Sequence, residues 1–126
     1  MKSIINTEHA PKAVGPYSQG VILGKLVFTS GQIPLDPRSM SIVEGGIKEQ
    51  TYQSLMNLKA VLEHAGASLN SVVKTTCFLA NMEDFSSFND IYMTFFDPAA
   101  APARSCIQAG KLPKDALVEI EAIAYI

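Results

Sequence analysis

The sequence predicts an α+β protein, with a mixed sheet and two helices packed on one of its faces. Apolar residues recur at spacings of three and four over residues 47–65, and an aromatic-rich helical pattern covers residues 82–96. Segments rich in β-branched residues precede, separate and follow these two patterns. With a first strand at residues 2–5, the order is β-β-β-α-β-α-β-β, which favours helices on a single face of one sheet.

The chain begins with a loop and a hairpin. Residues 6–19 include two prolines and a glycine, which break regular structure. The strand-like residues 20–23 and 26–30 flank Gly24-Lys25, and a two-residue turn that contains glycine is typical of a β-hairpin. Residues 31–46 hold further prolines and a glycine pair, and they are predicted to form a loop.

The first helix is the clearest element of the sequence. Its predicted inward positions are Thr51, Leu55, Leu58, Leu62 and Ala65. Gly66 follows where a residue in the left-handed conformation commonly ends a helix. Residues 72–79 predict the next strand, and the second helix should end before Asp97-Pro98.

The end of the chain predicts self-association. Residues 102–107 and 116–126 are predicted strands joined by a charged loop. One side of the last strand presents Val118, Ile120, Ala122 and Ala124, and the other combines Leu117, Ile123 and Tyr125 with Glu119 and Glu121. Both sides are largely apolar, yet two helices can cover only one face of the sheet. A second copy of the chain is the economical cover for the other face.

Length and charge limit the functional classes. With 126 residues the chain is predicted to form a single domain over residues 1–126. Ten lysines and arginines against twelve acidic residues give a net charge of −2 without a basic stripe, which argues against a nucleic-acid partner. The N-terminal apolar run is too short for a signal peptide, and no apolar run approaches about 18 residues, which argues against a membrane. We therefore expect a soluble cytoplasmic protein.

Neither a metal nor a cofactor is expected. Cys77 and Cys106 lie in apolar strand patterns without C-x-x-C spacing, which indicates buried reduced thiols. His9 and His64 lie in unrelated contexts, so no metal site can be built from the histidines and cysteines. The pair Gly45-Gly46 lacks the pattern of a phosphate-binding loop.

Asn89 is a polar residue within an aromatic helix face. The face comprises Phe85, Phe88, Tyr92, Phe95 and Phe96. A buried amide needs hydrogen-bond partners. Asn89 therefore either bonds the backbone of a neighbouring loop or borders a binding site.

Arg104 presents a similar alternative on a strand. Arg104, Cys106 and Gln108 are spaced two residues apart, so they share a face. The arginine either pairs internally with Glu119 or Glu121, or receives a ligand carboxylate through two parallel N–H donors. Glu119 is then either the partner of Arg104 or a carboxylate that orients water and accepts a proton.

Tyr17 and the pair Ser30-Gly31 are further candidates. The phenol of Tyr17 lies in a loop, where it closes a pocket or covers apolar surface, and Gly31 permits close approach of the backbone. No Ser-His-Asp arrangement is visible. The residues alone thus predict a small acid-binding pocket at a subunit boundary, without naming a reaction.

Six groups of residues, in order along essentially the whole chain, resemble the RidA/YjgF family of reactive intermediate deaminases. They are Ala10-Pro11 with Gly15-Pro16-Tyr17-Ser18-Gln19-Gly20, Thr29-Ser30-Gly31-Gln32-Ile33-Pro34, Asn57-Leu58-Lys59-Ala60-Val61-Leu62, Val73-Lys74-Thr75-Thr76, Pro102-Ala103-Arg104-Ser105-Cys106, and Leu112-Pro113-Lys114-Asp115 with Val118-Glu119-Ile120-Glu121-Ala122. One such segment would be weak evidence, whereas six in the same order are specific.

The resemblance implies a chorismate-mutase-like α+β fold and a homotrimer with pockets between neighbouring subunits. It also implies hydrolysis of 2-imino and 2-enamino acids, such as 2-iminobutanoate and 2-iminopropanoate, to 2-oxo acids and ammonia. Such a reaction needs orientation and general-base assistance, which together supply rate factors of about 10² to 10⁴ without a metal or cofactor.

The resemblance assigns roles to individual residues. Arg104 matches the carboxylate-binding arginine, and Cys106 contributes near that carboxylate through its backbone N–H. Glu119 matches the glutamate that holds the hydrolytic water. The remaining pocket positions match Tyr17, Ser30, Gly31 and Asn89.

One alternative and one departure stand beside this interpretation. The alternative is a non-catalytic trimer that binds 2-oxo acids or acts through a protein partner, although the presence of both Arg104 and Glu119 favours an enzyme. The departure is Gln108-Ala109-Gly110, where the family pattern leads us to expect a valine-like residue or Glu-Val-Ala. It bears on substrate preference more than on the reaction.

Overall fold

The computed structural model describes all of residues 1–126. Its strands and helices are β1 (Lys2–Ile5), β2 (Gly20–Leu23), β3 (Leu26–Thr29), α1 (Ile47–His64), β4 (Val72–Leu79), α2 (Phe85–Phe95), β5 (Ala103–Gln108) and β6 (Val118–Tyr125). Four short 3-10 turns lie at Leu69–Ser71, Met82–Asp84, Pro98–Ala100 and Pro113–Asp115. The predicted order of strands and helices is confirmed.

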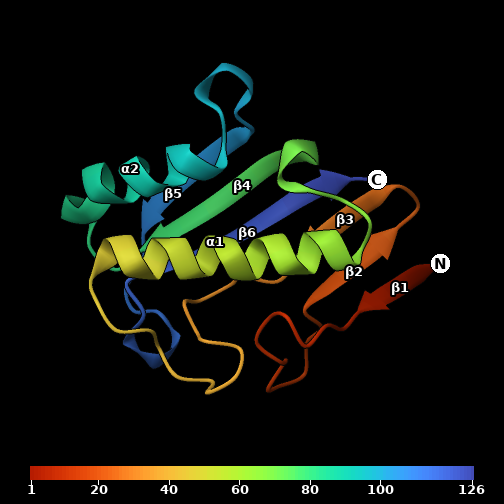
Figure 1. The fold of residues 1–126 in the computed structure, drawn as a ribbon, viewed down its shortest axis with the longest axis horizontal. Coiled ribbons are helices and arrows are strands. Elements are labelled where there is room, and N and C mark those ends of the chain that lie inside the picture. Colours follow the sequence, from red (N-terminus) through yellow and green to blue (C-terminus); the bar gives the residue numbers. More distant parts are fainter.

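The six strands form one sheet in the order β1-β2-β3-β6-β4-β5 (Figure 1). Neighbouring strands are antiparallel except β4 and β5, which run parallel. A parallel pair needs a crossover connection, and α2 supplies it. The last strand, β6, therefore lies between β3 and β4, with the hairpin on one side and Arg104 on the far edge strand β5.

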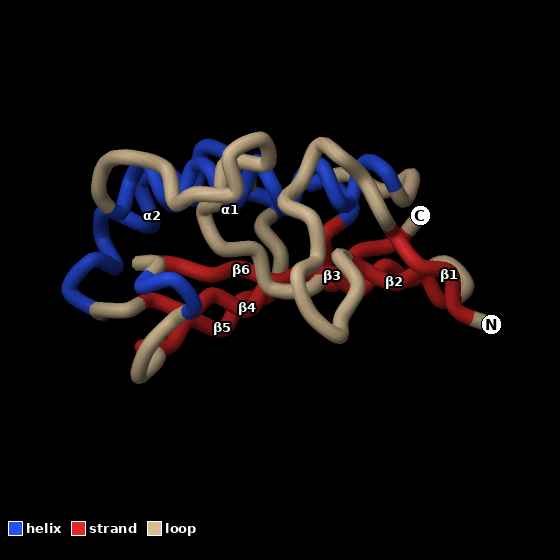
Figure 2. The backbone as a smooth tube through the Cα atoms, turned by 90° about the horizontal axis from the view of Figure 1, so that it is seen from below, coloured by secondary structure: helices blue, strands red, loops and turns tan.

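Both helices lie on the same face of the sheet (Figure 2). The predicted α+β class, a mixed sheet with two helices on one face, is confirmed. Neither helix has the length and apolar character needed to span a bilayer.

The core lies between the sheet and the helices. On α1 it contains Leu55, Leu58, Val61 and Leu62, all 0% exposed. Opposite them, β6 contributes Val118, Ile120, Ala122 and Ala124, which are the residues predicted to share one side of that strand. Burial of this stripe, at about 25 cal/mol per Å² of apolar surface, is the main force that holds α1 against the sheet.

The ends of α1 follow the local sequence. At the start, Glu49 Oε1 accepts a hydrogen bond from the Gly46 N–H at 2.8 Å, and backbone hydrogen bonds lower the pKa of Glu49. At the end, Gly66 takes a positive φ of 88° and Ala67 N donates to Leu62 O at 3.0 Å, as expected of a glycine that ends a helix.

The second helix is shorter than the predicted 82–96. Residues Met82–Asp84 form a 3-10 turn because the Asn81 side chain accepts from Glu83 N at 2.9 Å and tightens the entry to α2. The last strand is also shorter than predicted. Leu117 N donates to Gln50 Oε1 of α1 at 2.8 Å, so β6 begins at Val118, two residues later than predicted.

The face of the sheet away from the helices is largely apolar. In the single chain, Phe28, Leu26, Tyr125 and Ile107 on this face are 37%, 43%, 49% and 51% exposed. Phe28 pairs with Ile123, and Leu26 pairs with Tyr125, so apolar side chains run continuously across β3 and β6. This is the uncovered face that the sequence predicted.

Candidate functional site

One group of candidate residues gathers where α2 crosses β5. On α2, Phe85, Phe88, Asn89 and Tyr92 follow the spacing i, i+3, i+4, i+7, so they form one stripe. The Arg104 guanidinium carbon lies 4.8 Å from the ring centroid of Tyr92, 5.4 Å from Phe85 and 5.8 Å from Phe88. These distances are within the range of cation–π attraction. We call these three rings and Asn89 the arginine cradle.

Asn89 completes the cradle with a hydrogen bond. Arg104 Nη1 donates to Asn89 Oδ1 at 2.7 Å. Of the two alternatives for Asn89, contact with a neighbouring loop backbone is therefore not the one this structure adopts. The guanidinium carries five N–H donors. The amide of Asn89 uses one of them and brings no charge to the site.

Cys106 lies on the same face of β5 as Arg104. It is half-buried, and burial raises the pKa of its thiol, an effect that Arg104 partly offsets. Its partner in the parallel register is Cys77, which is fully buried and whose pKa is raised by burial to about 12. Both cysteines are free thiols, but only Cys77 is buried as predicted, because Cys106 lies on the edge strand β5.

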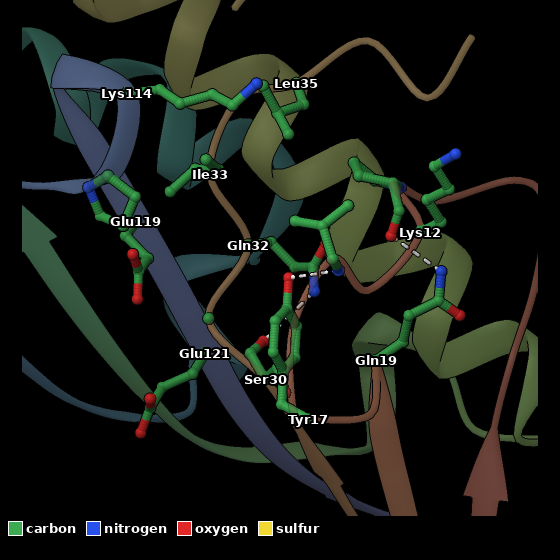
Figure 3. Close-up of a pocket in the computed structure, with 14 residues that line it drawn as sticks. Lys12, Tyr17, Gln19, Ser30, Gln32, Ile33, Leu35, Lys114, Glu119 and Glu121 are labelled. Atoms are coloured by element: carbon green, nitrogen blue, oxygen red, sulfur yellow. Dashed lines mark hydrogen bonds between the residues drawn. The ribbon is translucent and has the colours of Figure 1, made fainter. Parts of the chain in front are cut away.

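A second group of candidates lines a cleft of about 570 Å³ at the loop end of the sheet (Figure 3). Its lining includes three predicted site residues in loops and one on β6: Tyr17, Ser30, Gly31 and Glu119. Asn89, Arg104 and Cys106 are absent from this lining. The seven predicted site residues therefore form two separate groups within one chain.

Glu119 projects into the cleft close to the backbone of Gly31. A Cβ added at Gly31 would lie 2.7 Å from the carboxyl carbon of Glu119 and closer still to an oxygen, so no larger residue fits without displacing the carboxylate. Partial burial raises the pKa of Glu119, and the neighbouring carboxylate of Glu121 raises it further. A carboxyl group with a raised pKa is suited to take and return a proton.

The loop that carries Tyr17 is held by a glutamine. The Gln19 side chain is 2% exposed and bonds both the N–H and the carbonyl of Thr7, at 2.7 and 2.9 Å, and the carbonyl of Pro11 at 2.9 Å. Tyr17 itself is half-exposed, and its hydroxyl accepts from Val14 N at 3.3 Å. The phenol therefore faces the cleft from a loop that buried hydrogen bonds hold in place.

Residues missed by the sequence reasoning also line the cleft. Lys12, Gln32 and Lys114 do so, and Glu121, which the sequence offered only as an ion-pair partner, lies beside Glu119 (Figure 3). Gln19 and Gln32 belong to two of the segments that resemble the family, and both are buried in the structure. A glutamine next to glycine or proline in a loop was the only sign in the sequence of a structural role for them.

Gln108 lies outside both groups. Its side-chain oxygen accepts from Met82 N at 2.7 Å, which ties the end of β5 to the turn that precedes α2. Gln108 therefore acts on the position of α2, and no residue of the unusual segment Gln108-Ala109-Gly110 lines the cleft.

Comparisons with known proteins agree with this fold. The chain belongs to the family described as Endoribonuclease L-PSP, whose pattern matches residues 7–126. The crystal structure of the YjgF gene product of Escherichia coli superposes with a TM-score of 0.92 at 46% identity and covers 98% of both chains. The resemblance to the RidA/YjgF family is thereby confirmed.

Two further relatives carry information about ligands. A protein of Salmonella typhimurium named 2-iminobutanoate/2-iminopropanoate deaminase is 49% identical over 126 residues and covers 98% of this chain and of its own. The crystal structure of Escherichia coli TdcF with bound serine has a TM-score of 0.92 at 47% identity and covers 98% of both chains.

Proposed function

We propose that the protein hydrolyses 2-imino and 2-enamino acids, such as 2-iminobutanoate and 2-iminopropanoate, to 2-oxo acids and ammonia. The observation that carries the proposal is the arginine cradle, which holds a guanidinium between aromatic rings and engages one of its N–H groups with an amide. The remaining donors match the two oxygens of a carboxylate. The name of the Salmonella relative and the serine bound to TdcF support an amino-acid-like substrate.

The complete site requires two copies of the chain. Arg104 and Glu119 project from opposite faces of one sheet, so a small acid held by Arg104 cannot reach Glu119 of the same chain. The apolar face that carries Glu119 is uncovered in the single chain. We infer a homotrimer in which the Arg104 group of one subunit meets the cleft of its neighbour, because a cyclic assembly repeats the same contact three times.

Arg104 binds and orients the substrate carboxylate in this mechanism. The backbone N–H of Cys106, two residues along the same strand, offers the carboxylate an additional donor. Asn89 holds the guanidinium on one side, so the direction of its fork is set before the substrate arrives. This orientation supplies part of the rate enhancement, because the imine carbon is presented to water in a fixed position.

Glu119 acts on the water. In its carboxylate form it accepts a proton while the water oxygen forms a bond to C2 of the protonated imine, and a carbinolamine results. Glu119 then returns the proton to the amino group and takes the hydroxyl proton of the carbinolamine as the C–N bond breaks and the C2=O double bond of the 2-oxo acid forms. Ammonia leaves and takes up this proton as ammonium, which restores the Glu119 carboxylate. Its raised pKa strengthens it as a base relative to an ordinary glutamate.

The remaining cleft residues shape the site. Gly31 leaves room for the Glu119 carboxylate, and the Ser30 hydroxyl donates to the carbonyl of Ser18, which fixes the loop beneath Tyr17. Tyr17 closes the cleft over the substrate. The side chains in these roles are all ones that the family resemblance assigned to the site.

The family description names an endoribonuclease, but the chain favours the imine substrate. Its net charge is −2, and RNA binding relies on neutralising several phosphates. No histidine lines the cleft, although histidine is the side chain most often used for general acid–base chemistry.

The test couples the purified protein to a threonine dehydratase and follows loss of the imine. We expect decay faster than the uncatalysed rate, with Arg104→Ala reducing it to that rate. No acceleration by the native protein would reject the enzyme. If it still bound 2-oxobutanoate, the non-catalytic 2-oxo-acid-binding trimer would be the better explanation.

A further inference from the structure

A buried pair of hydroxyl groups joins α2 to the sheet beside Arg104. The Tyr92 hydroxyl lies 2.7 Å from Thr75 Oγ1. Thr75 is 0% exposed and Tyr92 is 6% exposed, so water does not compete for this bond. Thr75 is also the residue of β4 that pairs with Arg104 in the parallel register. The bond therefore links the ring nearest the guanidinium to the strand next to Arg104.

Stacking alone does not orient an arginine. The attraction between a cation and a ring face allows the guanidinium to slide and turn parallel to the ring. Two-pronged binding of a carboxylate depends on the direction of the fork, and a misplacement of about 1 Å can cost a factor of about 10² in rate. Asn89 restrains one edge of the guanidinium of Arg104. The position of the Tyr92 ring, 4.8 Å away, restrains its plane.

We propose that Tyr92 and Thr75 are positioning residues, whose hydroxyl pair fixes the ring beneath Arg104 and thereby directs the guanidinium toward the substrate carboxylate. The inference rests on the proposed function of Arg104 as the carboxylate-binding group. It adds two residues that touch no substrate and that no family resemblance assigned. The pair acts through Arg104 alone.

The surroundings of the pair are neutral, which leaves the charge of Arg104 for the ligand. Cys77 Sγ donates to Thr75 Oγ1 at 3.9 Å, and burial raises the pKa values of Cys77 and Tyr92, so both stay protonated near neutral pH. Asn89 is uncharged. No anion of the cradle competes with a substrate carboxylate for the guanidinium.

Kinetics of Tyr92→Phe, Thr75→Val and the double variant test the proposal. Tyr92→Phe keeps the ring and removes only the hydroxyl. We expect KM for the imine and Ki for 2-oxobutanoate to rise about 5- to 10-fold, with a smaller fall in kcat, because a turned guanidinium also orients the bound imine less well. The double variant should resemble the single variants, because either change already breaks the bond. It also leaves no buried hydroxyl unpaired, so it remains a usable test if a single variant misfolds.

The controls separate positioning from general loss of stability. Thr75→Ser keeps a hydroxyl and should retain native KM. Val61→Ala creates a buried cavity on α1, away from the cradle, and should lower thermal stability without changing KM. If the double variant is folded and its KM lies within about twofold of the native value, the positioning role is overturned.

A readout without turnover separates this inference from the proposed function. The two terminal guanidinium nitrogens of Arg104 should give distinct ¹⁵N signals in the ligand-free native protein and averaged signals in Tyr92→Phe. If the native protein hydrolyses no imine but this contrast is found, the proposed function fails and the positioning of Arg104 stands. Identical Arg104 spectra in the two proteins would overturn the inference, whatever the activity.

Discussion

Arg104 and Glu119 project from opposite faces of the same sheet. Thr75 pairs with Arg104 on β5 and with Ala122 on β6, which places Arg104 on the helix-covered side with the buried Ala122. Glu119 lies three residues from Ala122 along β6, and an odd separation on a strand reverses the face. The internal ion pair between them, one of the two alternatives that the sequence left open, is therefore excluded within a chain.

This separation predicts that two inactive variants, one changed at Arg104 and one at Glu119, restore activity when they assemble together. Arg104→Ala and Glu119→Gln should each be inactive alone. When the two variants are unfolded together in equal amounts and refolded, about one quarter of the sites in a random cyclic assembly combine an intact Arg104 with an intact Glu119. We expect close to that fraction of native activity, measured as imine decay.

Light scattering on the same samples should report a trimer at micromolar concentration. A refolded mixture with no activity would contradict a site shared between subunits. A stable monomer of the native chain would contradict the assembly itself.

The second prediction concerns the geometry of Arg104. Arg104→Lys keeps the positive charge but loses the planar fork, and an ammonium also fits the three rings of the cradle less well. We expect this variant to recover less than about a tenth of native kcat/KM, while circular dichroism and thermal unfolding show a folded protein. Full activity in Arg104→Lys would mean that charge alone suffices and that the cradle has no directing role.

Glu119→Gln separates water activation from charge balance. The variant keeps the shape and the hydrogen-bonding capacity of the side chain but cannot accept the proton. We expect kcat to fall by roughly 10² or more, while calorimetry shows that 2-oxobutanoate still binds. Weaker binding with unchanged kcat would assign Glu119 to charge balance instead.

The pH dependence should report the environment of Glu119. Its pKa is raised, first by burial and second by the carboxylate of Glu121. Because the carboxylate is the active form, activity is lost as the pH falls through the pKa of Glu119. In the assembled site the Arg104 guanidinium of the neighbouring subunit acts against these two causes and favours the carboxylate. Glu121→Gln removes the neighbouring negative charge, lowers the pKa of Glu119, and should move the limb to lower pH. A limb that moves upward or stays in place would show that another group controls it.

Local signals predicted most of the fold. The strand at 72–79 was predicted with the observed bounds, and the first helix was predicted to end one residue beyond the observed His64. The start of α2 was not predicted, because the side chain of Asn81 competes with the helix for the backbone N–H of Glu83.

The sequence did not predict that the site residues form two groups on opposite faces of the sheet. Alternation along β5 shows that Arg104 and Cys106 share a face, but it does not show which face of the sheet that is. That depends on the register between β5, β4 and β6, which pairs residues such as Arg104 and Thr75 that are far apart in the chain. The pinning of the Tyr17 loop by Gln19 likewise depends on contacts formed only after folding.

Gly31 provides the last prediction, because it tests the Glu119 carboxylate without altering any ionisable group. A Cβ at Gly31 would lie 2.7 Å from the carboxyl carbon of Glu119, which is closer than real Cβ contacts allow, so Gly31→Ala must displace that carboxylate. We expect kcat to fall by about 10-fold or more, because a catalytic group that is displaced by about 1 Å already loses much of its effect. The matched control is Gly110→Ala, where an added Cβ meets no atom within 4 Å, and its activity should equal that of the native protein. Thermal unfolding of both variants should show folded proteins. Native kcat in a folded Gly31→Ala variant would mean that the position of Glu119 beside Gly31 is not the one used in the reaction.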